Sequence, residues 1–171
     1  MPLRPDQDLA AQPTTEAIVG FSGVLWVYHV FAADAPLFAG KPMDQIAGPL
    51  WVFAGFKPDD DTYRLWISEE VPLTWRSFII LHELYEFVTP GGIVWDKRSD
   101  NQALHGPSCL DALGFEVNRV RVSGYDLQVY LDFRAEQLAS MIAHLGDRGQ
   151  HIVPLLDAVQ VRLTNLQAEL P

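Results

Sequence analysis

Apolar residues follow two different spacings along this chain, one typical of strands and one typical of helices. Residues 50–56 and 62–68 are rich in β-branched and aromatic side chains, and they flank residues 57–61, whose composition is typical of a turn. This pattern predicts a β-hairpin. Farther along, apolar residues recur at helical spacing and predict helices over residues 107–120, 133–145 and 153–170.

The first third of the chain is less decisive. Residues 17–33 are almost continuously apolar, with Gly20 and Gly23 opposing one unbroken helix and residues 24–31 rich in strand-forming types, so helix and strands both stay open. The run is shorter than the ~20 residues that a membrane-spanning helix needs, and we interpret it as buried core. Residues 42–47 predict a short helix.

Together these elements predict an α+β fold with a small antiparallel sheet and about five helices. Residues 1–14 are rich in proline and lack periodicity, which predicts a loose N-terminal tail. Residues 15–171 then form a single globular domain, because 171 residues of 49% hydrophobic composition suffice for one sizeable core.

The most informative segment is residues 75–88, a strongly apolar predicted helix that contains His-Glu-Leu-Tyr-Glu. His82 and Glu86 are four residues apart, so on a helix their side chains lie side by side and can offer two ligands to one metal ion. Glu83 is one step around the helix, close enough to act on a water that the metal holds. In the related His-Glu-x-x-His signature, two histidines bind zinc and the glutamate is the general base. The pattern therefore predicts a zinc site within residues 62–116, with His82 and Glu86 as ligands and Glu83 as the catalytic residue.

Two residues of the next predicted helix extend this ligand set. A third ligand from His105 would give the three-ligand arrangement that a catalytic zinc site with an open fourth position requires. Cys109, one turn beyond His105, would be a fourth ligand, which would close the site and argue against catalysis.

A simpler interpretation stays open beside the metal site. On a helical wheel Arg76, His82, Glu83 and Glu86 share one arc, as an ordinary solvated face would, and Arg76 could pair with Glu83. The remainder of the helix is so apolar, however, that burial on most sides is expected. Buried histidines and carboxylates need polar partners or a metal.

Charge and cysteine content narrow the class of protein. The net charge of −10 and the absence of any run of Lys and Arg argue against nucleic acids and anionic membranes as partners. A single cysteine excludes an internal disulfide framework and favours a cytoplasmic protein.

A strand, a proline, a helix carrying His82, Glu83 and Glu86, and a downstream His105 together resemble the minimal zincin core of metallopeptidases. The segment 62–116 is also similar to a group of small, largely uncharacterised bacterial and phage proteins described as zincin-like. The resemblance implies a zincin-like core in which His82, Glu86 and His105 bind zinc, Glu83 polarises the bound water, and residues 63–68 border the substrate cleft. Glu86 departs from the usual second histidine, and its negative charge argues against efficient peptide hydrolysis but not against metal binding.

Three functions follow as hypotheses. The first is a zinc-dependent hydrolase of zincin type, a peptidase of narrow specificity acting on a peptide or protein substrate. The second is a non-catalytic, degenerate zincin-like domain with structural zinc or no metal, which acts through protein–protein interaction. The third, motivated by net charge alone, is an acidic domain that binds a basic protein. The aromatic content would also allow a homodimer.

Overall fold

The computed structural model describes residues 13–21, 24–37, 40–57, 62–86, 88–89, 93–94, 102–145 and 153–171. Its main sheet has four strands, β1 (Thr15–Phe21), β2 (Val24–Phe31), β3 (Val52–Lys57) and β4 (Thr62–Ser68), in the order β1-β2-β4-β3. Residues 17–33, for which helix and strands were both open, thus form most of β1 and all of β2. The rich content of β-branched and aromatic side chains in this segment decided the outcome.

The predicted hairpin is confirmed, but the purely antiparallel sheet is wrong. β3 pairs antiparallel with β4, with Val52 opposite Ile67, whereas β2 pairs parallel with β4, with Val30 opposite Ile67. The chain leaves β2, passes through α1 (Met43–Ala47) and β3, and re-enters the sheet beside β2 in the same direction. Such a crossover makes neighbouring strands parallel, and hydropathy within each strand does not reveal it.

The predicted number of helices is confirmed for the part of the chain that the structure describes. The remaining helices are α2 (Leu73–Glu86), α3 (Gln102–Val122), α4 (Leu127–Leu145) and α5 (Val153–Ala168), and the short strands β5 (Val88–Thr89) and β6 (Ile93–Val94) pair separately. None of these helices is both long enough and apolar enough to cross a membrane.

Two helices begin earlier than the sequence predicted. α3 begins at Gln102 and includes Pro107 as its sixth residue rather than starting there. α4 begins at Leu127 because Asp126 is its N-cap, with the Asp126 carboxylate accepting a hydrogen bond from the Val129 N–H at 3.2 Å.

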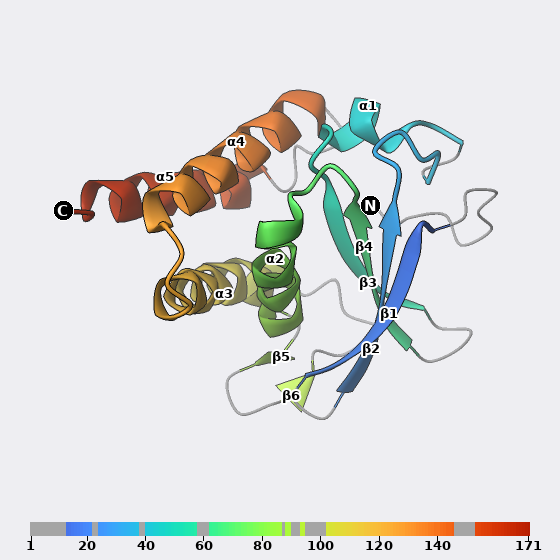
Figure 1. Ribbon diagram of the computed structural model, residues 1–171, viewed down its shortest axis with the longest axis horizontal. Coiled ribbons are helices and arrows are strands. Elements are labelled where there is room, and N and C mark those ends of the chain that lie inside the picture. Colours follow the sequence, from blue (N-terminus) through green and yellow to red (C-terminus); the bar gives the residue numbers. More distant parts are fainter. Residues whose placement is uncertain are drawn as a thin grey trace.

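α2, α3, α4 and α5 lie on one side of the sheet, α1 lies at one end of its strands, and α2 lies between the sheet and α3 (Figure 1). Apolar residues of α2, including Phe78, Ile79 and Leu84, pack with Leu65 and Ile67 of β4 in one buried cluster. A second cluster joins α1, α4 and α5. α2 is therefore covered on both sides, and polar side chains on these sides are buried.

The N-terminal end of the described chain is tied to the sheet. Both the backbone N–H and the hydroxyl of Thr14 donate to the Val30 carbonyl, at 2.7 and 2.8 Å. Residues 1–12 of the predicted tail, and residues 58–61 of the predicted turn, lie outside the described residues.

Candidate metal centre

α2 carries two of its polar residues into the protein interior. His82 is 3% exposed and Glu86 is 5% exposed, whereas Glu83 is half-buried. The predicted ion pair between Arg76 and Glu83 is not among the contacts of the described residues. The Arg76 guanidinium instead donates hydrogen bonds to the backbone carbonyls of Glu69 and Val71. The interpretation of His82 and Glu86 as part of a solvated face is therefore wrong, because the helix is enclosed by the sheet and by α3.

The three predicted residues of α2 converge. His82, Glu83 and Glu86 each offer a ligand atom within 4.8 Å of the other two, and His82 Nε2 lies 3.5 Å from Glu86 Oε2. In a tetrahedral site with bonds of about 2.0–2.1 Å, neighbouring ligand atoms are about 3.3–3.4 Å apart. Imidazole nitrogen and carboxylate oxygen are both accepted by zinc, so these residues fit the ion in chemistry and in spacing.

The other ring nitrogen of His82 is held by α3. Nδ1 lies 2.6 Å from Glu116 Oε2, within ion-pair distance of it. In a neutral imidazole one nitrogen carries the proton and the other the lone pair. A carboxylate oxygen only 2.6 Å from Nδ1 favours the proton on Nδ1 and leaves the lone pair on Nε2, the nitrogen that faces Glu86.

Glu116 is itself fully enclosed by polar partners. Its side chain is completely buried, Arg134 Nε lies 2.8 Å from Oε1, and the Tyr130 hydroxyl donates to the same oxygen. Burial by itself raises the pKa of the Glu116 carboxyl. The attraction of Arg134 and His82 and the hydrogen bonds from His82 and Tyr130 outweigh that cost, so its pKa lies below the ordinary 4.5.

Tyr130 remains a donor in this arrangement. Burial and the negative charge of Glu116 raise the pKa of the Tyr130 phenol well above its ordinary 10.0, although Arg134 opposes them. Arg134 supplies positive charge beside Glu116, so Glu116 would keep a counter-charge when Nε2 of His82 bound a metal. The network therefore accommodates the tautomer that a metal ligand needs.

The ligands predicted on α3 remain predictions. The contacts Tyr85–Phe115 and His82–Glu116, with Trp75 against Tyr125 beyond the end of α3, show that α2 and α3 run antiparallel. At the level of His82, α3 presents Glu116. His105 and Cys109 belong to α3, but their side chains lie outside the described residues, and the His105 backbone is three turns, or about 16 Å, from Glu116.

Sequence reasoning missed Glu116, Tyr130 and Arg134. Two signals were available: Glu116 interrupts the apolar run Leu113-Gly114-Phe115-Glu116-Val117, and Tyr130 and Arg134 are four apart on a helix. Neither signal shows which residues would contact each other, because the contacts join side chains of three different helices.

The strand that precedes α2 is in the interior of the sheet. β4 is paired with β2 on one edge and β3 on the other over most of its length, so its backbone does not offer an edge to an extended peptide. The edge strands of this sheet are β1 and β3. Residues 63–68 therefore could border a substrate only through their side chains.

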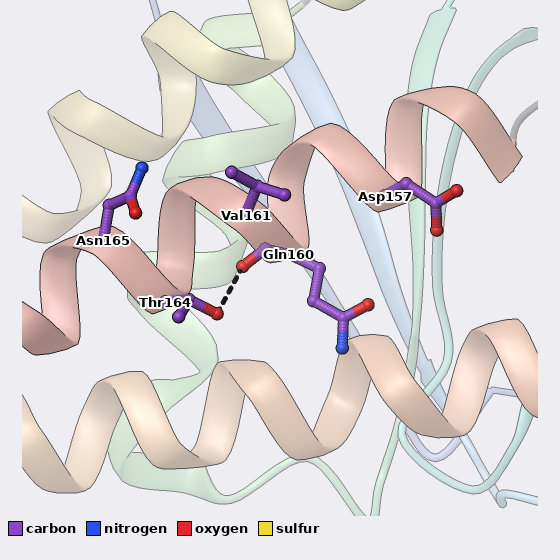
Figure 2. Close-up of a pocket in the computed structure, with 5 residues that line it drawn as sticks. All are labelled: Asp157, Gln160, Val161, Thr164 and Asn165. Atoms are coloured by element: carbon purple, nitrogen blue, oxygen red, sulfur yellow. Dashed lines mark hydrogen bonds between the residues drawn. The ribbon is translucent and has the colours of Figure 1, made fainter.

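An open hollow lies elsewhere, along α5 (Figure 2), and is lined by Asp157, Gln160, Val161, Thr164 and Asn165. These side chains are all exposed, and the Thr164 hydroxyl donates to the Gln160 carbonyl of the same helix. One carboxylate on a single exposed helix face is no catalytic arrangement.

Comparison with known proteins gives no match: no family model, no curated protein and no solved structure is similar to this chain.

Proposed function

We propose that this domain binds a zinc ion through His82 Nε2 and Glu86 and acts as a zinc-dependent hydrolase of zincin type on a peptide or protein substrate. The observation that carries the proposal is the 2.6 Å contact between His82 Nδ1 and Glu116 Oε2. Histidines that bind metals almost always donate their second ring N–H to a carboxylate, a carbonyl or a water. Here that partner is a buried carboxylate, and Nε2 faces a second carboxylate at ligand–ligand distance.

Each residue of α2 has a separate part in this proposal. His82 supplies a neutral lone pair in a fixed direction, and Glu86 supplies an anionic oxygen on the same side of the helix. Glu83, half-buried, is the group placed to accept a proton from a water beside them. A bound zinc ion would supply the positive charge that acidifies that water and polarises a carbonyl.

The resemblance to zincins implies His105 of α3 as a third ligand, but the His105 backbone lies about 16 Å along α3 from Glu116, so the proposal rests on His82 and Glu86. Cys109 in addition would close the coordination sphere and leave a structural site. Substitution of each residue by alanine separates these cases. If His105→Ala loses zinc and Cys109→Ala keeps it, the site has an open coordination position. If both variants lose zinc, Cys109 is a fourth ligand and the site is closed.

One observation favours a second candidate, a non-catalytic domain in which the same residues hold structural zinc or no metal. His82 and Glu86 are almost completely buried, and Glu116, Tyr130 and Arg134 form a closed polar network around the ring. A buried network of this kind stabilises a unique packing without any ion. The domain would then act through protein–protein interaction.

Hydrolysis is tested with Glu83→Gln, because glutamine keeps the size of the side chain but accepts no proton at neutral pH. The screen uses zinc-loaded protein and a library of quenched fluorescent peptides. We expect the wild-type protein to cleave some of the peptides. Glu83→Gln should cleave the same peptides at least about 100-fold more slowly. Glu136→Gln, on the exposed face of α4, is the matched control. Equal rates in Glu83→Gln and wild type would exclude this glutamate as the base.

A further inference from the structure

Two residues of α4 hold Glu116 by the oxygen that does not face His82. The Tyr130 hydroxyl and Arg134 Nε both contact Oε1, whereas His82 Nδ1 contacts Oε2. Arg134 Nη2 also lies 3.5 Å from Oε2, so its planar guanidinium spans both carboxylate oxygens. Three donors from two helices therefore fix the orientation of one carboxylate.

Both donors are themselves held in place. Tyr130 is fully buried, and its ring packs edge-on against Trp75 and Phe78 with centroid distances of 5.1 and 5.9 Å. Arg134 donates to the Gln137 side-chain carbonyl, and the Gln137 amide donates to the Leu50 carbonyl at 2.8 Å. The network thus runs from α2 through α3 and α4 to the chain segment just before β3.

We propose that Tyr130 and Arg134 are positioning residues for the metal site of α2, which they control through Glu116. A carboxylate with one hydrogen-bond partner can rotate about its last side-chain bond, and the imidazole bonded to it would rotate with it. With Oε1 anchored by α4, Oε2 stays directed at Nδ1 and the lone pair of Nε2 stays directed at Glu86. The inference rests on the proposed function for its effect on metal affinity, but its effect on the His82 ring is independent of any metal.

The test compares conservative variants of the two residues. Tyr130→Phe removes only the hydroxyl, and Arg134→Lys keeps the charge but loses the planar fork. Tyr125→Phe is the matched control, because Tyr125 packs on the same two rings, Trp75 and Phe78, but is 46% exposed. Zinc affinity of the folded proteins is measured by competition with a chromogenic chelator.

We expect Tyr130→Phe and Arg134→Lys to bind zinc about 10-fold to 100-fold more weakly than wild type, the range typical of lost outer-shell partners. Tyr125→Phe should stay within about twofold of wild type, since it removes no contact of Glu116. A purely packing role for Tyr130 and Arg134 would lower the melting temperature and leave the zinc affinity of the folded protein unchanged. Affinities within about twofold of wild type in both variants would overturn the inference.

A second measurement separates this inference from the proposed function. In metal-free protein, ring ¹⁵N shifts of His82 report which nitrogen carries the proton. Wild type and Tyr125→Phe should show a single state with the proton on Nδ1, and the two α4 variants should show a mixture of states. If wild type binds no zinc, the proposed function fails, and the ring shifts alone test whether α4 positions the His82 ring. Unchanged shifts in both α4 variants would refute this positioning, whereas altered shifts would support it.

Discussion

Nδ1 of His82 and Oε2 of Glu116 lie 2.6 Å apart in the buried polar cluster between α2 and α3. This pair joins a histidine of the recognisable motif to a carboxylate of the next helix. It fixes which ring nitrogen faces Glu86, and it links the motif to α4 through Tyr130 and Arg134.

Glu116→Gln should weaken both folding and zinc binding. Glutamine is similar in size, but it leaves Arg134, whose side chain is 13% exposed, without its counter-charge. Loss of one partner of a buried ion pair typically costs about 3–5 kcal/mol. We expect a decrease of about that size in the free energy of unfolding, measured in urea, and a zinc affinity lowered by about 10-fold to 100-fold. Asp111→Asn, an exposed carboxylate on the same helix, should change neither quantity.

The contribution of Glu116 to stability should depend on pH in a defined direction. Its pKa in the folded protein lies below 4.5 because Arg134 and His82 outweigh the effect of burial. The ionised carboxylate therefore stabilises the fold fully above the unfolded pKa and loses this effect as the pH falls through the lower, folded pKa. The difference in unfolding free energy between wild type and Glu116→Gln, measured in urea from about pH 7 to pH 3, should be constant near neutrality and shrink in acid. A difference that grows in acid would contradict the assigned charge state.

Gly48→Ala should be strongly destabilising. Gly48 ends α1 with φ 78° and ψ 167°, a region that is nearly exclusive to glycine, and an added Cβ would collide with the Ser140 side chain of α4. We expect a loss of about 3 kcal/mol or more in chemical denaturation, combining backbone strain with steric overlap.

Two other glycines provide controls for that variant. Gly40 has φ 72° but open space around it, so Gly40→Ala should cost only about 1–2 kcal/mol. Gly114 lies inside α3 with nothing near its added Cβ, and Gly114→Ala should stabilise by about 0.5–1 kcal/mol. Equal effects at Gly40 and Gly48 would contradict the close packing of α1 on α4.

Asp126→Ala should destabilise α4, the helix that carries Tyr130 and Arg134. The Asp126 carboxylate caps the Val129 N–H, and loss of such a cap typically costs about 1 kcal/mol. Asp126→Asn keeps an acceptor oxygen at the cap and should restore most of the loss, as thermal unfolding would show. An unchanged melting temperature in Asp126→Ala would mean that α4 does not depend on this cap.

The hairpin, the helices and the alignment of the His-Glu-x-x-Glu motif were predictable because each depends on local spacing. β3 and β4 follow from strand-forming residues around a turn, and the alignment of His82 with Glu86 follows from the period of a helix. The parallel pairing of β2 with β4 depends instead on a crossover of about thirty residues, which no local pattern encodes. Glu116 and Arg134 escaped prediction for the same reason, since their roles arise from contacts between α2, α3 and α4.

The central claim is tested most directly by the zinc content of untagged protein purified without chelator, measured by elemental mass spectrometry. We expect close to one zinc per chain in wild type and in His144→Ala, which removes an exposed histidine of α4. His82→Ala should lose the metal. Wild-type protein without zinc, even after reconstitution with zinc salts, would contradict the account and leave His82, Glu86 and Glu116 as a buried polar network that stabilises the fold.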